Sequence, residues 1–464
     1  MACSPELLRK TRNGDGDDRV DVAIVGAGLS GLRAATRLAA AGRSVRVFEA
    51  RDRVGGKMLT EEIGGVAVDL GAHWIGPGQD RINALVGEMG IHTERQHLAG
   101  KAINFLGGRR RLSRSPIPPL APHSLLEVGL AQWRMERLRR RVPVAEPLAA
   151  PGARRLDAQT LEGWKRRMLH SRGARALLDV ATRLIWGAEP RELSLLYFLQ
   201  YVNAGHGFQT LIDNEGGAQQ DHLHGGTQQI CERLAASLPR GSVVLNAPVR
   251  SLEQDDAGVA VIGDGHRCRA RAAILALSPA LAARIDCRPA LPPARESLAQ
   301  RMPPGAYAKA VLVFEHPWWR AEGLSGIATA DSGPVQMVVD ASPSSSGPGV
   351  LVAFVTGDPA REMGRLEPGQ RRERTLAAVR RLFGDGAARP GHFHDHYWEH
   401  EPWSRGAPAG LMGPGVLSNY GEALRAPCGR LHWAGTETAT EWIGYMEGAL
   451  QAGERAAKEV IESY

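Results

Sequence analysis

Three glycines near the start of the chain have the spacing of a turn that binds phosphate groups. Gly26, Gly28 and Gly31 follow the apolar run 22–25, and a helical pattern begins directly after them. Gly26 allows a tight turn, Gly28 leaves the backbone open to a pyrophosphate, and Gly31 lets the helix lie close to a sheet. Glu49 ends a second apolar run 18 residues after Gly31, where an acid can accept hydrogen bonds from ribose hydroxyls. The spacing therefore predicts a dinucleotide site rather than a site for a pterin or a single nucleotide.

Two further features could take part in chemistry. Gly55 and Gly56 lie between Arg51 and Lys57, which predicts backbone close to the phosphates with two cations as charge partners. An ordinary surface turn is the alternative. Lys309 stands at the start of the apolar run 310–314, where a lysine must either reach solvent or hold a water. The alternative is a surface lysine whose stem lies along apolar side chains.

The totals limit the class of protein. A chain of 464 residues is too long for one core, so we expect two intertwined domains. A content of 43% hydrophobic and 23% charged residues indicates a soluble globular protein. The five cysteines are scattered without a CxxC pair, which suggests neither a disulfide framework nor a metal site. Residues 1–18 lack the apolar centre of a signal peptide, and we expect them to be a disordered lead. Because no apolar run is long enough to span a bilayer, we expect a cytoplasmic protein without a membrane partner.

The basic residues need a separate interpretation. The net charge of +7 is modest for this length. Trp133 lies in the helical stretch 125–142, which also carries five arginines, a composition that could indicate nucleic-acid binding. Since the sequence has no DNA- or RNA-binding motif, we interpret the stretch as a solvated helix face and expect no nucleic-acid partner.

Both ends of the chain resemble a known family. The sequence GAGLSGL…VFEARDRVGGK of residues 26–57 and LHWAGTETATEWIGYMEGALQAGERAA of residues 431–457 resemble the flavin-dependent amine oxidases, the group that contains monoamine and polyamine oxidases. The resemblance implies an α/β fold, with a doubly wound Rossmann-type FAD-binding domain and an interleaved α+β substrate domain. We expect the first domain to comprise residues 19–90, 216–300 and 405–464, and the second to comprise residues 91–215 and 301–404.

The resemblance also implies roles for individual residues. Lys309 would hold a water beside the flavin N5 and favour electron transfer to oxygen, and Tyr445 would form an aromatic wall that holds the amine. His73 is interpreted as a hydrogen-bonding spacer rather than an acid or base. The residues expected to contact FAD are Gly26, Gly28, Leu29, Ser30, Gly31, Glu49, Ala50, Arg51, Gly55, Gly56, Lys57, Gly71, Ala72, His73, Trp74, Val249, Trp398, Trp403, Gly435, Glu437, Tyr445 and Met446. The expected substrate pocket includes Tyr201, Pro408 and Trp442.

Three positions depart from the family pattern. The family more often has arginine where this chain has Lys57, so two-pronged binding to phosphate is lost there. Ala407 occupies the position of the cysteine that links the flavin covalently, so we expect FAD to be bound without a covalent bond. Pro408 replaces the second tyrosine of the aromatic cage, which argues against simple arylalkylamines as substrates. Either Trp398 or Trp403 could supply the missing ring.

The function implied by the resemblance is oxidation of a C–N bond. Hydride would pass from the carbon beside a neutral amine to flavin N5, giving an imine and then a carbonyl, while oxygen would be reduced to hydrogen peroxide. An alternative is a flavin dehydrogenase, desaturase or oxidase-cyclase that acts on a larger natural product, and a third hypothesis is a flavin-bound scaffold without turnover. The expected partners are a small amine and oxygen, and a homodimer is an open alternative to a monomer.

Overall fold

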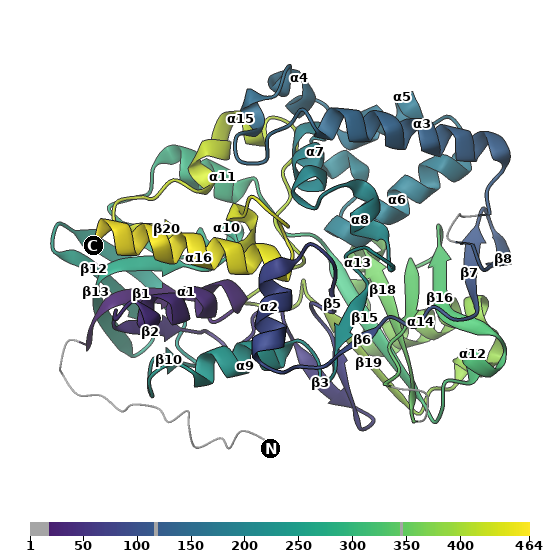
Figure 1. Cartoon of the computed structure of the whole chain (residues 1–464), viewed down its shortest axis with the longest axis horizontal. Helices are drawn as coiled ribbons and strands as arrows, with labels where there is room; N and C mark the ends of the chain where they lie inside the picture. Colours follow the sequence, from purple (N-terminus) through teal and green to yellow (C-terminus); the bar gives the residue numbers. More distant parts are fainter. Residues whose placement is uncertain (1–17, 116–118, 344–346) are drawn as a thin grey trace.

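The computed structural model describes residues 18–115, 119–343 and 347–464. Figure 1 shows one sheet with its helices towards the C-terminus and a second sheet at the other end, beneath a layer of helices. The expected lead, residues 1–18, lies outside the described residues except for Asp18, with which the first strand begins. None of the helices in the described ranges combines the length and the apolar composition needed to cross a bilayer.

The first sheet has eight strands in the order β10-β2-β1-β13-β12-β11-β14, with β20 beside β13. The strands β10, β2, β1, β13 and β20 run parallel, and β12 is antiparallel to its neighbours. The last four residues of the central strands β1 and β13 are buried on both faces of the sheet. This explains why these residues, 22–25 and 272–275, are all apolar. The strands span Asp18–Val25 (β1), Val45–Phe48 (β2), Val243–Val244 (β10), Val249–Asp255 (β11), Gly258–Gly263 (β12), His266–Leu275 (β13), Asp286–Arg288 (β14) and Leu431–Trp433 (β20).

Helices α1 (Leu29–Ala40) and α16 (Met446–Ser463) lie side by side against this sheet (Figure 1). A Cβ atom on Gly453 would lie 2.3 Å from the backbone oxygen of Ser30, so α16 packs against the start of α1 without room for a side chain. The small residue at this position therefore lets the last helix pack closely against α1. Helices α2 (Asp80–Glu88) and α9 (Gln228–Ala236) contribute to the same apolar core.

The second sheet has seven strands in the order β19-β15-β18-β17-β16-β7-β8. It is mostly antiparallel, with one parallel pair between β16 and β7. Its strands span Lys101–Leu106 (β7), Arg109–Ser113 (β8), Tyr307–Phe314 (β15), Leu324–Ala330 (β16), Met337–Asp340 (β17), Gly349–Thr356 (β18) and His392–Tyr397 (β19).

Alternation along β15 gives its two faces different environments. Ala308, Ala310 and Leu312 belong to the core formed with α12 (Trp318–Ala321) and α14 (Pro368–Phe383). Because side chains alternate between the faces of a strand, Tyr307 and Lys309 face the other way. This second face packs against the hairpin of β3 (Thr60–Ile63) and β4 (Val66–Asp69).

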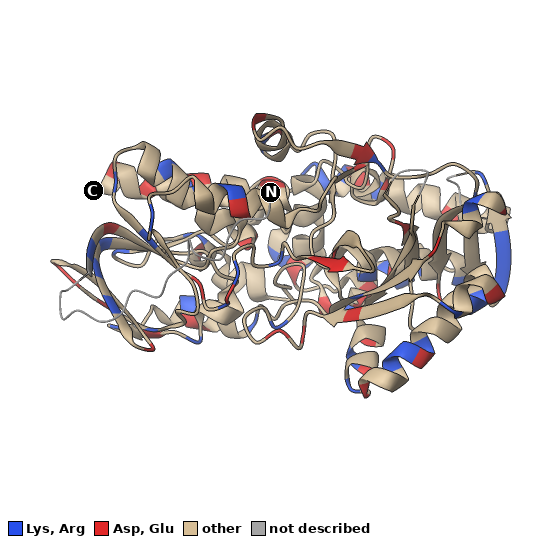
Figure 2. Cartoon of the chain, turned by 90° about the horizontal axis from the view of Figure 1, so that it is seen from below, with Lys and Arg blue, Asp and Glu red and all other residues tan. Residues whose placement is uncertain are grey.

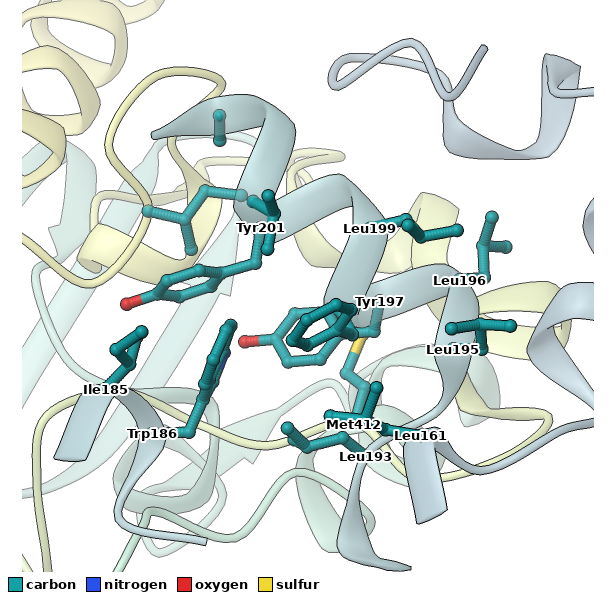
Figure 3. Close-up of a cluster of buried hydrophobic side chains, with 14 of the residues drawn as sticks. Leu161, Ile185, Trp186, Leu193, Leu195, Leu196, Tyr197, Leu199, Tyr201 and Met412 are labelled. Carbon is teal, nitrogen blue, oxygen red and sulfur yellow. The ribbon is translucent and has the colours of Figure 1, made fainter. Parts of the chain in front are cut away.

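A layer of helices lies above the second sheet in Figure 1 and has its own apolar core. Ser171 and Ser194 cap α6 and α7 by accepting hydrogen bonds from backbone N–H groups. Figure 3 shows part of this core, where Tyr201 of α7 lies beside Trp186 and Ile185 of α6. The helices of the layer are α3 (Pro122–Arg139), α4 (Ala153–Asp157), α5 (Leu161–Met168), α6 (Arg172–Trp186), α7 (Leu195–Ala204), α8 (Phe208–Ile212) and α15 (Val416–Tyr420).

A small three-stranded sheet joins the two ends of the molecule, with β9 between β5 and β6. The remaining elements are β5 (Trp74–Ile75), β6 (Thr93–Arg95), β9 (Asp221–Leu223), α10 (Pro279–Ala282), α11 (Pro293–Gln300) and α13 (Asp358–Gly364). The α/β fold expected from the sequence is confirmed. The exact domain boundaries stay a prediction, and residues of α15 pack with the helical layer although we expected 405–464 to belong to the other domain.

Candidate active site

A cavity of about 400 Å³ runs from the glycine turn after β1 to the face of the second sheet that carries Lys309. Every residue expected to bind FAD or the substrate contributes to its wall, except Gly31 and Trp442. The structure therefore brings together residues that lie more than 400 positions apart in the chain, from Gly26 to Met446. Both ends of the sequence are needed to form one cavity.

The glycine end of the cavity has the close backbone approaches that a bound pyrophosphate requires. Gly26 has a φ of 101°, and Gly56 has a φ of 59° with its missing Cβ only 3.2 Å from the Cα of Gly28. A Cβ on Gly31 would lie 2.0 Å from the oxygen of Gly26. Gly31 thus allows close packing of α1, as its expected role requires, but it does not line the cavity.

The acid and the first cation of this end are already hydrogen-bonded to the protein. Glu49 accepts from the backbone N–H groups of Ala27, at 2.8 Å, and Arg51, at 3.0 Å. A carboxylate has about four acceptor positions, so Glu49 keeps capacity for ribose hydroxyls. The Arg51 guanidinium donates to Glu401 and Ser404, which orients it and partly neutralises its charge.

Lys57 lines the cavity and is held by a distant segment of the chain. Its ammonium donates to the backbone oxygen of Pro408 at 2.7 Å. Burial lowers the pKa of Lys57, and the negative charge of Glu437 opposes that shift. Lys57 therefore links the second glycine turn to the segment around Pro408. A contact from Lys57 to the cofactor stays a prediction.

Lys309 is 2% exposed and has two of its three donors occupied. The ammonium donates to the backbone oxygens of Asp69, at 2.9 Å, and Gly71, at 2.7 Å. Since an ammonium carries three N–H donors, one remains for a group in the cavity. Burial lowers the pKa of Lys309 to about 7, while Asp69 opposes the shift. Lys309 is thus a buried amine that changes charge near neutral pH.

His73 is a buried imidazole whose two ring nitrogens have no hydrogen-bond partner within the described structure. Its nearest acid is Asp69, whose Oδ2 lies 4.0 Å from the His73 Nδ1 atom. Burial and the charge of Lys309 hold the pKa of His73 well below its ordinary value, so the ring is neutral. Leaving a buried polar group unpaired costs free energy, and His73 lines the cavity. The residue therefore fits a bound group that supplies hydrogen-bonding atoms here, as a flavin ring would.

An aromatic slot lines the other end of the cavity. The ring of Tyr445 lies 6.3 Å from that of Tyr201, and burial raises the pKa of both hydroxyls, which keeps them neutral. Across the cavity, Phe354 stacks on Trp74 at 5.6 Å and meets Tyr307 edge-on at 6.1 Å. Rings from five different parts of the chain thus line one apolar space.

Tyr307 and Phe354 are wall residues that the sequence analysis missed. Tyr307 lies two positions before Lys309 on β15. Phe354 lies on the neighbouring strand β18, directly opposite Lys309. Both geometries place the side chains on the face that carries the lysine. Since side chains alternate along a strand, the sequence could have placed Tyr307 on the same face as Lys309. The position of Phe354 depends on the pairing of β15 with β18, which the sequence does not show.

Trp442 does not line the cavity, and its place in the substrate pocket stays a prediction. The Trp442 indole N–H donates to the backbone oxygen of Gly78 at 2.8 Å, and its ring meets Tyr445 edge-on at 5.2 Å. Trp442 is 1% exposed and lies behind Tyr445 rather than on the cavity wall. Its contact with Gly78, 364 residues away, could not be read from local sequence.

The two tryptophans proposed as substitutes for the missing cage ring have other neighbours. Trp398 is fully buried and donates to the backbone oxygen of Leu70 at 3.0 Å. Trp403 packs against the guanidinium of Arg250, which is next to Val249. Both line the cavity, but the ring that stands near Tyr201 and Lys309 on the sheet side is Tyr307.

The fold and site can be compared with known proteins. A family model described as flavin-containing amine oxidoreductase matches residues 29–461. AofH of Mycobacterium tuberculosis, named after the flavin-containing monoamine oxidases, is 43% identical over 441 residues, which is 95% of this chain and 96% of AofH. An L-amino acid dehydrogenase of Synechocystis is 34% identical over 453 residues, covering 95% of this chain and 94% of the relative. The structure of putrescine oxidase bound to putrescine has a TM-score of 0.92 at 33% identity, covering 96% of this chain and 99% of that one.

Proposed function

Because the chain belongs to the flavin-containing amine oxidoreductases, we propose that it is an FAD-dependent oxidase of a monoamine with an apolar body. The observation that carries this proposal is the buried Lys309, which keeps one free donor in a cavity whose opposite end has the glycine turns of a dinucleotide site. When bound, FAD accepts a hydride from the carbon beside the amine nitrogen and passes the electrons to oxygen, which gives an imine and hydrogen peroxide.

Different residues of the chain would bind different parts of FAD. The Gly28 and Gly56 turns and the start of α1 would bind the pyrophosphate. Glu49 would accept from ribose hydroxyls, and His73 would hydrogen-bond the ring end with its unpaired nitrogens. Met446 begins α16, whose N-terminus lies on the cavity wall and offers a partial positive charge to the electron-rich edge of a reduced flavin. Ala407 has no thiol, so FAD would be held without a covalent bond.

The aromatic slot sets how the amine is held. Rings of Tyr445 and Tyr307 stand on the wall with Phe354, and their π-faces can polarise and position an amine nitrogen. Because Tyr307 would supply from the second sheet the ring that Pro408 cannot supply, simple arylalkylamines return as candidate substrates, against the expectation drawn from Pro408 alone. The neutral form of the amine is the reactive one, so activity should rise with pH through the pKa of the substrate.

Charge at the substrate end separates three substrate classes. A diamine such as the putrescine bound by putrescine oxidase leaves a second ammonium to be neutralised, and an amino acid brings a carboxylate. Apart from Lys309, the residues that the helical layer and the second sheet contribute to this end of the cavity wall are uncharged. They are Leu184, Ile185, Tyr201, Leu211, Ala218, Gln219, Tyr307 and Phe354. This environment favours a substrate whose only charge is at the reacting nitrogen.

The test uses purified protein loaded with FAD. Arylalkyl or cycloalkyl monoamines should bleach the oxidised flavin spectrum without oxygen and should produce peroxide with oxygen, whereas putrescine and free amino acids should do so far more slowly. Preference for a diamine or an amino acid would contradict the substrate class. Failure of every amine to bleach the flavin would contradict the activity itself.

A second candidate function is a dehydrogenase, which the similarity to an L-amino acid dehydrogenase supports. Such an enzyme would bleach with substrate but react slowly with oxygen and quickly with an artificial electron acceptor. Comparing peroxide formation with reduction of a quinone or dye under the same conditions separates the two functions. Identification of the organic product separates either of them from an oxidase-cyclase that acts on a larger natural product, whose product would be cyclic.

A further inference from the structure

Helix α3 has apolar residues on its outer face as well as on the face that packs in the core. Ser124, Ala131 and Met135 are buried against the helical layer. Leu126, Leu130 and Trp133 are 66%, 54% and 58% exposed, and we call these three residues the apolar stripe. Their spacing of four and three residues places them on one side of the helix. Only Leu98 and Leu112 are comparably exposed among the large apolar residues in the part of the chain that the structure describes.

Arginines continue the stripe towards the end of the helix. The Arg137 guanidinium lies 5.7 Å from the centre of the Trp133 ring. Arg134, Arg140 and Arg141 are also exposed, and we call the four residues the cationic end. Across the described ranges, no carboxylate forms a salt bridge with any of these four guanidinium groups. Figure 2 shows Lys and Arg interspersed with Asp and Glu over most of the molecule, apart from a blue strand at the far right, which is β8 with its three consecutive arginines.

The acids of α3 do not neutralise this surface. Glu136 forms an ion pair with Arg139 at 2.6 Å, on the side where Arg139 also donates to Asn203 of α7. Glu127 accepts from the backbone N–H groups of His170 and Ser171. The outer face of the helix is therefore apolar in its first half and positively charged in its last turns.

This charge pattern decides whether the outer face of α3 binds a second copy of the chain or an anionic membrane surface. In a symmetric dimer formed through this face, the same patch would meet itself, and the arginines would find no carboxylate on the second copy to pair with, since Glu127 and Glu136 are already engaged. An anionic bilayer surface satisfies both halves, because leucine and tryptophan side chains enter the headgroup region and arginines bind lipid phosphates. We propose that α3 binds the surface of membranes that contain anionic phospholipids, with the apolar stripe facing the bilayer. The helix would lie on the membrane and would not cross it.

The experiment measures sedimentation of the FAD-loaded full chain with vesicles. We expect binding to vesicles of phosphatidylcholine plus phosphatidylglycerol, weaker binding to phosphatidylcholine alone, and a loss of binding as salt is added. The affinity of the triple variant L126S/L130S/W133S for anionic vesicles should be at least about fivefold lower than that of wild type. The pair R137Q/R140Q should lose the preference for the anionic vesicles. Leu98→Ser is the matched control, since it removes an exposed leucine from another surface and should bind like wild type.

Folding of each variant is checked by its flavin content and its circular dichroism, because all substituted side chains are exposed. The proposal is wrong if wild type does not sediment with anionic vesicles or if the triple variant sediments equally well. It is also wrong if wild type is a dimer in solution that the triple variant converts to a monomer, since the stripe would then bind a second copy of the chain.

Discussion

The ammonium of Lys309 donates a hydrogen bond of 2.9 Å to the backbone oxygen of Asp69, and both side chains are buried beside the same cavity. Burial raises the pKa of the Asp69 carboxyl to about 6 and lowers the pKa of Lys309 to about 7. Both groups therefore change charge close to neutral pH. The lysine and the strand that carries it are the parts of the site from which most of the predictions follow.

Replacing Lys309 with methionine should slow reoxidation of the reduced flavin by oxygen. A fixed cation stabilises the negative charge that forms when an electron reaches oxygen, and loss of such a group typically costs about 10²–10³-fold in rate. Rapid mixing of the reduced variant with oxygen measures this step directly. Reduction by the amine without oxygen should change much less, and an unchanged reoxidation rate would remove Lys309 from this role.

The charge of Lys309 also predicts how stability depends on pH. Its pKa is about 7 in the folded protein and 10.5 in the reference state, so the unfolded chain binds more protons between these values. Folding is therefore increasingly favoured as pH rises through this window. Urea unfolding gives the free energy of unfolding of wild type and of Lys309→Met. Relative to the variant, wild type should become more stable as the pH rises from 7 towards 10. A constant difference would mean that the lysine is not strongly desolvated.

Tyr307 should matter for the amine because of its ring. Substituting leucine removes the π-face, and contacts of this kind contribute roughly 1–2 kcal/mol, or about tenfold in kcat/KM. Tyr307→Phe keeps the ring and should stay within about threefold of wild type. Steady-state kinetics with one monoamine, at matched flavin content, compare the two variants. Equal losses in both would assign the role to the hydroxyl.

His73 should contribute to cofactor binding through its ring nitrogens. Leucine at this position fills similar space without a polar atom, whereas asparagine retains a donor and an acceptor. We expect His73→Leu to bind FAD about tenfold more weakly, as for the loss of one hydrogen bond to a buried group. Titration of the apoprotein with FAD, followed by flavin fluorescence, gives the dissociation constants. Asparagine should restore part of the loss, and no loss in either variant would leave His73 as a spacer only.

Denaturing the protein should release its flavin. Ala407 offers no sulfur for a covalent bond. After acid precipitation, the yellow colour should therefore be in the supernatant. A yellow pellet would show a covalent link through another residue.

Much of the site was accessible from sequence because its chemistry lies in short motifs. The turns at Gly28 and Gly56 and the segment around Tyr445 each occupy a few consecutive residues, and all three line the cavity. The buried contact of Trp442 was not accessible from sequence, because its indole partner, Gly78, belongs to a distant loop.

The local sequence also could not predict which face of α3 is exposed. Leucines occur on both of its sides, so the pattern does not tell which side is buried. The tertiary packing of Ala131 and Met135 decides it and leaves Leu130 and Trp133 outside.

The residues that line the cavity begin at Val25 and end at Ala449, and α16 packs against α1. A ribosome must therefore release nearly the whole polypeptide before the cofactor has a complete place to bind. Flavin capture becomes a late event in biosynthesis, and proteolytic clipping ahead of α16 would yield a colourless product even if the first sheet had already formed.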